Sequence, residues 1–268
     1  MESSQAYFPP SANKKHVLLT WAQSINGRIG YVVESPSLGQ LRLSSKESFV
    51  MTHLLRTKFD GIMVGSRTAE NDNPSLTAKL PDPANPDCLL PLNKQPIPII
   101  VDSNLRLDYA SLKVIRLARE RLGKPPLIIV APSIWQQVQH DNKLKEAVKL
   151  IQSVGGRCII RNEDSPDSWS DYVALDKLLQ NGVNRIMVEG GAELLAKAFG
   201  STDIDAYVVT IVPKIFSCSN TTEIKNLNNL NLTTNSHWYP CGPDVIFTNY
   251  SDEFYESYKS LLTNSDAI

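Results

Sequence analysis

The chain has 268 residues, of which 42% are hydrophobic and 21% charged, and its formal net charge is −1. An α/β domain of this size buries a large core without disulfides or a structural metal, and a near-neutral chain lacks the surplus of Lys and Arg that nucleic-acid binding requires. No apolar run reaches the ~18 residues of a membrane helix, and the polar N-terminal segment does not read as a signal peptide. We therefore expect a cytoplasmic protein with no nucleic-acid or membrane partner.

Residues 1–14 are interpreted as a flexible N-terminal arm, and residues 15–268 as a single domain. Residues 16–22 form an apolar run that predicts a first buried strand, and residues 24–29 predict a turn into a second extended piece. The segment 44–47 fits a capping box and starts a helix that ends near Phe59. Four apolar residues of that helix are expected on one buried face: Val50, Met51, Leu54 and Leu55.

The rest of the chain alternates between apolar strands and amphipathic helices. Residues 77–96 are rich in proline and predict an exposed loop without secondary structure. One helix is expected around Tyr172, Leu175, Leu178 and Leu179. Strands are expected at 61–65, 97–101, 127–131, 157–160, 185–189, 207–212 and 245–248, and further helices at 144–151 and 192–199. This alternation predicts an α/β fold with a mostly parallel central sheet and helices on both faces.

In such sheets, ligands bind beyond the carboxyl ends of the strands. The segment 188–192 joins a strand to a helix through two glycines, which let a backbone approach a ligand closely and offer free N–H groups to a pyrophosphate. A plain tight turn explains the same residues, and the two interpretations stay open. Neither a G-x-G-x-x-G fingerprint nor a P-loop motif occurs.

A second polar turn follows the strand at 61–65. Thr68 and Asp72 are four residues apart, so a helical turn places a hydroxyl and a carboxylate on one side, where they suit a ribose or an amide. Capping and Asx-turn roles suit the same residue types and remain the alternative. The four histidines are scattered without metal-ligand spacing, so no metal site is expected.

Five segments occur in an order that resembles a known family: 24–29, 60–68 with 72–76, 99–103, 188–191 and 212–214. The chain resembles the reductase domain of bacterial riboflavin deaminase-reductases, and more closely the stand-alone fungal and archaeal reductases that act on 2,5-diamino-6-ribosylamino-4(3H)-pyrimidinone 5′-phosphate. The likeness covers roughly residues 15–250. It implies a dihydrofolate-reductase-like fold, NADPH as cofactor, a homodimer, and reduction of the ribosylamino group to a ribitylamino group.

The resemblance also implies roles for particular residues. Thr68 and Asp72 would contact the cofactor, Ile160 would face its adenosine half, and its pyrophosphate would be wrapped by Val188, Glu189, Gly190, Gly191 and Ala192. The residues expected near the substrate are Ser24, Asn26, Leu76 and Glu189. Asn26 departs from the family, because many bacterial members carry Asp there.

The expected chemistry is hydride transfer from the nicotinamide to C1′ of the opened sugar, with the protein mainly aligning the two carbons. No proton donor is assigned, although Glu189 is conceivable, and Arg42 and Lys214 are candidates for binding the substrate phosphate. Two alternatives stay open: a folate or pterin reductase of the same fold, and a non-catalytic dinucleotide-binding module. Residues 207–212 are one candidate dimer surface, as an exposed apolar strand.

Overall fold

The computed structural model describes residues 15–31, 43–82, 85–217, 221–224 and 235–251, so the predicted N-terminal arm lies outside the described residues. The chain divides into two compact units. One, called here the continuous unit, comprises Arg56–Met187, and the other, the split unit, comprises Met1–Leu55 and Val188–Ile268. A single domain over 15–268 stays a prediction. Within the described ranges, every helix is too short or too polar to cross a membrane.

The continuous unit is built on a parallel arrangement of strands in the order β9-β3-β6-β7-β8. Their bounds are β3 (Gly61–Gly65), β6 (Ile97–Val101), β7 (Leu127–Val130), β8 (Arg157–Ile160) and β9 (Arg185–Val188). Strands β3, β6, β7 and β8 pair in parallel. The N–H of Asp60 donates to the carbonyl of Arg185 at 2.9 Å, which joins the starting ends of β3 and β9. The near-continuous apolar runs of these strands are explained by burial on both faces.

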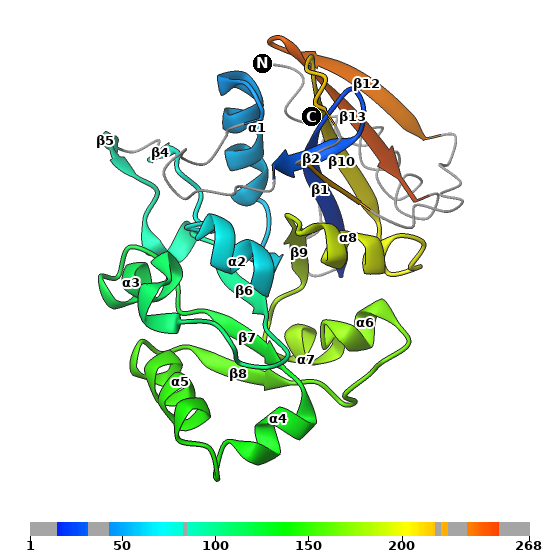
Figure 1. Ribbon diagram of the computed structural model, residues 1–268. Coiled ribbons are helices and arrows are strands. Elements are labelled where there is room, and N and C mark those ends of the chain that lie inside the picture. The colour runs from blue at the N-terminus through cyan, green and yellow to red at the C-terminus, as the bar shows by residue number, and fades with distance from the viewer. Residues whose placement is uncertain (1–14, 32–42, 83–84, 218–220, 225–234, 252–268) are drawn as a thin grey trace, which may run out of the picture. The chain divides into compact units, whose positions relative to one another are not determined.

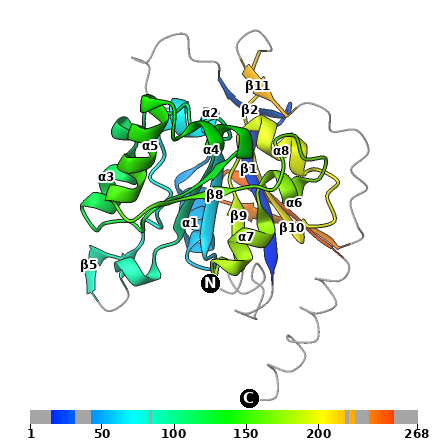
Figure 2. The ribbon, with the colours of Figure 1, turned by 90° about the horizontal axis from the view of Figure 1, so that it is seen from below.

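Helices lie on both faces of these strands, as the sequence predicts. The helices are α2 (Ser66–Asp72), α3 (Lys113–Arg119), α4 (Pro132–Gln137), α5 (Asn142–Ser153), α6 (Trp169–Tyr172) and α7 (Leu175–Gln180). Crossovers from β3 through β6 and β7 to β8 all step in one direction, whereas the return from β8 to β9 steps the other way. Because parallel crossovers are right-handed, the returning helices cover the opposite face. Figure 2 shows α3 and α5 on one side and α6 and α7 on the other.

The split unit contains strands in the order β12-β13-β10-β1 (Figure 1). Their bounds are β1 (His16–Ser24), β10 (Ala206–Val212), β12 (Ser236–Cys241) and β13 (Asp244–Tyr250). Strand β1 runs parallel to β10, and β13 is antiparallel to both β10 and β12. A small ribbon pairs β2 (Arg28–Tyr31) with β11 (Thr221–Glu223), and the described part of this unit contains the helices α1 (Lys46–Arg56) and α8 (Ala192–Ala198).

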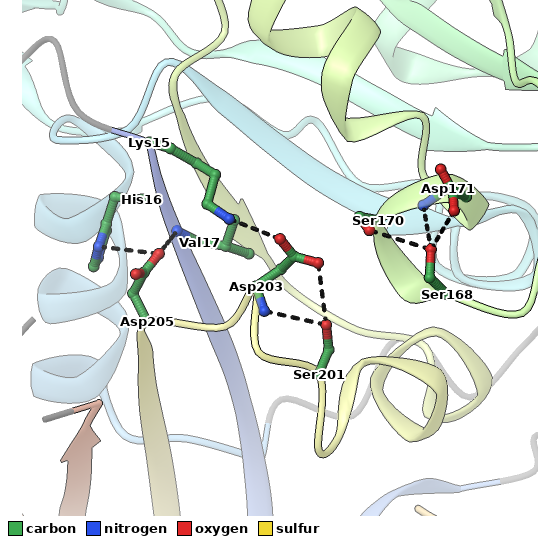
Figure 3. A network of polar contacts seen from close by, with 9 residues as sticks. All are labelled: Lys15, His16, Val17, Ser168, Ser170, Asp171, Ser201, Asp203 and Asp205. Carbon is green, nitrogen blue, oxygen red and sulfur yellow. Dashed lines mark hydrogen bonds and ion pairs between the residues drawn. The ribbon is translucent and has the colours of Figure 1, made fainter. Parts of the chain in front are cut away.

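Aspartates join the amino ends of β1 and β10 (Figure 3). The carboxylate of Asp205 accepts the N–H of Val17 at 2.8 Å and lies 3.7 Å from Nδ1 of His16. Two residues earlier, Asp203 forms an ion pair with Lys15 at 2.7 Å. These contacts set the register of the parallel pair at its amino end, so that Ser24 and Val212 stand opposite each other at the carboxyl end.

The proline-rich stretch 77–96 was expected to lack secondary structure, and this expectation is wrong. It contains β4 (Pro81–Asp82) paired with β5 (Asn85–Leu89), followed by a 3-10 turn at Leu92–Lys94. The side chain of Gln95, 4% exposed, accepts the N–H of Ala78 at 2.9 Å and donates to the carbonyl of Leu90, also at 2.9 Å. One buried amide therefore closes the excursion at its base and satisfies backbone groups that a free loop would leave to water.

The single helix expected around Tyr172 is two helices, α6 and α7, separated by Ala174 in a left-handed conformation with φ 49°. Trp169 and Val173 are buried and are four residues apart, whereas the buried Leu175 and Leu178 belong to a different helical face. An uninterrupted helix cannot point both pairs into the core. The break at Ala174 turns α7 so that Leu175 and Leu178 also point into the core.

Helix α1 also buries a different face from the expected one. Leu55 is fully buried, but Val50 and Leu54 are 48% and 39% exposed, and the buried side carries Ser48 and His53. Its N-terminus is capped by Ser45, whose hydroxyl accepts the N–H of Ser48 at 3.2 Å. The second half of the expected capping box is supplied from β13, because the carboxylate of Asp244 accepts the N–H of Ser45 at 2.8 Å.

Strand β10 is not an exposed edge, so residues 207–212 do not offer the dimer surface suggested by their composition. β1 and β13 occupy its two sides, and six of its seven residues are buried. Strand β12, which the sequence analysis missed, forms the terminal strand of this order, and its Trp238 is 61% exposed.

Candidate functional site

In the split unit, the turn after β1 is bound to the segment after β10. The buried hydroxyl of Ser24 donates to Oδ1 of Asn26 at 2.8 Å and accepts the N–H of Arg28 at 3.0 Å. Nδ2 of Asn26 donates to the carbonyl of Phe216 at 2.7 Å, and its Oδ1 accepts the N–H of Phe216 at 3.2 Å. The N–H of Ile25 donates to the carbonyl of Lys214 at 2.9 Å. The structure thus brings together three of the predicted residues: Ser24, Asn26 and Lys214.

This clamp explains why asparagine suits position 26. Its amide both donates to and accepts from the backbone of Phe216. An ionised aspartate accepts only, so it would leave the carbonyl of Phe216 without that donor. The departure from the bacterial pattern is therefore consistent with a turn whose side chain holds the neighbouring loop. The other phosphate candidate, Arg42, lies outside the described residues.

The paired-glycine turn leads from β9 into α8. Gly190 and Gly191 have φ values of +112° and +60°, conformations that side chains with a Cβ rarely adopt. Phe199, at the far end of α8, packs against Trp21 and Tyr207 with ring centroids 5.4 and 5.9 Å apart. Tyr207 lies near the amino end of β10, so α8 runs back along the strands and its first turn lies at their carboxyl ends. Within the split unit, the glycine turn and the Ser24 turn therefore share one edge.

In the continuous unit, Thr68 and Asp72 both belong to α2, with the four-residue helical spacing that was predicted. Helix α2 starts after Gly65 without a side-chain cap, so capping does not explain Thr68. The neighbouring Asn73 has a structural role, because its Oδ1 accepts the N–H of Lys113, the first residue of α3, at 2.7 Å. Leu76, a predicted substrate residue, is fully buried with φ 49°, so its side chain is part of the core.

Beyond the carboxyl end of β6, a buried carboxylate is fully engaged by the chain. Asp102 is 1% exposed and accepts the Tyr109 hydroxyl at 2.8 Å and the N–H of Leu107 at 3.1 Å. Burial raises the pKa of Asp102 above its ordinary value, and the hydrogen bond from Tyr109 counteracts part of that rise. These contacts hold the loop between β6 and α3.

Beyond the carboxyl end of β8, the carbonyl of Ile160 accepts Nζ of Lys177 at 2.6 Å. The next residue, Arg161, is 5% exposed, and the sequence analysis did not single it out. Its Nη2 donates to the carbonyl of Asp164 at 2.7 Å, and its guanidinium carbon lies 5.2 Å from the centroid of the Tyr172 ring. A single arginine after a strand does not identify a binding site from the sequence, because its burial depends on residues of other elements.

The strands are mostly parallel, and polar turns follow their carboxyl ends, which is where open α/β sheets bind their ligands. The fold and these turns therefore define the class of α/β ligand-binding proteins. The model of the RibD C-terminal domain family matches residues 15–247, and the chain belongs to this family.

The chain is also similar in sequence to named reductases over most of its length. It is 28% identical to a 2,5-diamino-6-ribosylamino-4(3H)-pyrimidinone 5′-phosphate reductase of Saccharomyces cerevisiae, over 93% of this chain and 94% of the relative. The enzyme of the same name from Candida glabrata is 33% identical over 73% of both chains. Among solved structures, the riboflavin biosynthesis reductase of Saccharomyces cerevisiae superposes with a TM-score of 0.64 and 24% identity, covering 91% of this chain and 93% of the other. That likeness confirms the expected fold.

Proposed function

We propose that the protein is an NADPH-dependent reductase of riboflavin biosynthesis, which converts the ribosylamino group of 2,5-diamino-6-ribosylamino-4(3H)-pyrimidinone 5′-phosphate into a ribitylamino group. The family match over residues 15–247, together with relatives of that name along most of the chain, carries this proposal. We further propose a cytoplasmic homodimer; light scattering on the purified protein tests the oligomeric state.

The residues at the strand ends support a proposed site for a dinucleotide and a phosphorylated sugar. Thr68 and Asp72 on α2 are proposed to contact the cofactor, and the turn 188–192 its pyrophosphate, because two positive-φ glycines leave its backbone uncovered by side chains. Ile160 is proposed to face the adenosine half. Contact of one dinucleotide with all of these residues stays a prediction.

When bound, the nicotinamide supplies a hydride for C1′ of the opened sugar. The task of the chain is to hold the sugar within about 3–3.5 Å of the nicotinamide and to exclude water. The clamped turn of Ser24 and Asn26 is suited to that task, since its side chains are fixed by the segment after β10. Glu189 and the exposed Lys214 complete the proposed side-chain contacts with the substrate, with Lys214 for the phosphate. The side chain of Leu76 belongs to the core, so this residue is proposed to approach the substrate through its backbone alone.

A direct assay tests the proposal. Purified protein is mixed with NADPH and, in turn, the ribosylaminopyrimidine phosphate and dihydrofolate, while the absorbance of the reduced nicotinamide is followed. We expect oxidation with the pyrimidine only. Oxidation with dihydrofolate instead identifies a pterin reductase, and NADPH binding without oxidation by either substrate identifies a non-catalytic module.

The glycine turn can be tested with a matched pair of variants. Gly190→Val is expected to weaken NADPH binding at least ~10-fold in a titration, because a side chain there forces the turn out of its positive-φ conformation. Gly200→Val is the control, since Gly200 also has a positive φ (+80°) but lies beyond the other end of α8. Equal NADPH affinity of the two variants contradicts the pyrophosphate assignment.

Asp72→Ala is expected to lower kcat/KM about 10-fold with an unchanged melting temperature, because Asp72 is exposed at the end of α2. Glu70→Ala on the same helix, which removes an exposed ion pair with Arg106, is the control. If Asp72→Ala lowers the melting temperature and leaves the kinetics intact, Asp72 has a structural role only.

A further inference from the structure

Arg161 is a buried cation whose hydrogen-bonding capacity the described residues do not fill. Within the described part of the chain its Nε and Nη1 are buried without a hydrogen-bond partner, and its Nη2 donates to the carbonyl of Asp164. Among the described residues no carboxylate forms an ion pair with it. The nearby carboxylate of Asp164 is exposed and accepts the N–H of Ser133 at 2.9 Å instead.

Such an arrangement costs folding free energy. A buried donor without a partner costs about 1–3 kcal/mol, and more when it is charged. Burial lowers the pKa of Arg161, while Tyr172 and Asp164 counteract that effect. The Tyr172 ring, 5.2 Å from the guanidinium carbon, contacts the cation without providing an acceptor oxygen. The guanidinium is thus held in place while two of its nitrogens, Nε and Nη1, have no acceptor among the described residues.

The missing acceptor is expected to be an anion with several oxygens. Nε lies beside Nη2 on one edge of the planar guanidinium and Nη1 lies beside Nη2 on another. Each edge presents two nitrogen donors whose spacing matches two oxygens of a phosphate. A second cation stands close by, because Nζ of Lys177 donates to the carbonyl of Ile160, the residue before Arg161. The segment 160–161 therefore lies beyond a strand end with two cations beside it, which favours a dianion over a neutral ligand.

We propose that Arg161 binds the phosphate monoester on the adenosine ribose of the dinucleotide and so selects NADPH over NADH. This inference rests on the proposed function, which places the adjacent Ile160 against the adenosine half. The 5′-phosphate of the pyrimidine substrate offers the same chemistry, and the experiment separates the two sources.

The test measures binding of two probes to the full chain by calorimetry: adenosine 2′,5′-bisphosphate and adenosine 5′-monophosphate. The wild type is expected to bind the bisphosphate more tightly. Arg161→Gln is expected to weaken bisphosphate binding ~10- to 100-fold and to leave monophosphate binding unchanged, as loss of hydrogen bonds to a charged group predicts. Arg161→Lys keeps the charge without the planar guanidinium and is expected to retain part of the preference.

Arg157→Gln is the control, because Arg157 is an exposed arginine at the opposite end of β8 and is expected to leave both affinities unchanged. Melting curves check that each variant is folded. An unchanged bisphosphate preference in Arg161→Gln, or an equal loss for both probes, overturns the proposal. So does a raised KM for the pyrimidine phosphate with the bisphosphate preference intact, which assigns Arg161 to the substrate.

Neither probe requires turnover, so the result is independent of the proposed reaction. If no pyrimidine is reduced but the preference depends on Arg161, the inference stands and the proposed substrate falls. If the pyrimidine is reduced and Arg161→Gln keeps the preference, only the inference falls.

Discussion

Asp102 and Arg161 are both buried charged residues beyond strand ends of the continuous unit, on either side of β7, yet their surroundings differ. Asp102 accepts hydrogen bonds from a hydroxyl and a backbone N–H, whereas Nε and Nη1 of Arg161 have no partner among the described residues. A buried charge that the chain satisfies stabilises the frame. A buried charge that the chain leaves incomplete is a sign of ligand recognition, because folding alone gives no reason to retain it.

The largest expected effect on stability is that of Asp102→Ala. Removing the carboxylate leaves the hydroxyl of Tyr109 and the N–H of Leu107 buried without an acceptor, so the free energy of unfolding is expected to fall by ~3 kcal/mol. Urea denaturation measures this loss. A change below ~1 kcal/mol would remove the distinction drawn between the two residues.

A smaller loss, ~1.5 kcal/mol at neutral pH, is expected for Tyr109→Phe, which removes one of the two donors. Its pH dependence sharpens the comparison. Burial raises the pKa of Asp102 in the folded protein above its value in the unfolded chain. The protonated carboxyl therefore contributes its whole share of the folding free energy at a pH below the unfolded-state pKa. This contribution is lost as the pH rises through the folded-state pKa. The Tyr109 hydroxyl offsets that loss by binding the ionised form. The deficit of the variant should therefore shrink as pH falls through the folded pKa of Asp102; a pH-independent deficit contradicts this role.

The smallest effect is expected for Arg161→Met. An apolar side chain of similar length removes the incomplete cation, so the free energy of unfolding without ligand should stay within ~1 kcal/mol of the wild type. Denaturation with and without adenosine 2′,5′-bisphosphate measures this. A loss as large as that of Asp102→Ala shows that Arg161 belongs to the frame.

Much of the fold was predictable because buried parallel strands are continuous apolar runs. The bounds of β3, β6 and β8 were predicted to the residue. Strand β12 was missed because it alternates between half-buried and exposed residues and includes Pro240, which favours an edge position. The break at Ala174 was missed because alanine gives no sign of a left-handed conformation.

The candidate site was predictable only where backbone chemistry marks it. Gly190 and Gly191 are visible in a sequence because few residues replace glycine at positive φ. The hydrogen bonds between Asn26 and Phe216 could not be predicted, because the two residues are 190 positions apart in the sequence. Nor could Arg161, whose burial and missing partners are tertiary properties.

The division of the chain has a consequence for its synthesis. The continuous unit is one uninterrupted segment, Arg56–Met187, whose strands are joined by local crossovers. In the split unit, β1 pairs with β10, so Leu18 cannot pair until its partner Ala206 has been synthesised. As the chain leaves the ribosome, its middle can fold while β1 still lacks its neighbour, and pairing across so long a loop makes that step slow. Until β10 has been synthesised, β1 lacks the strand with which it pairs in parallel, and an unpaired apolar strand is the kind of segment that aggregates during folding.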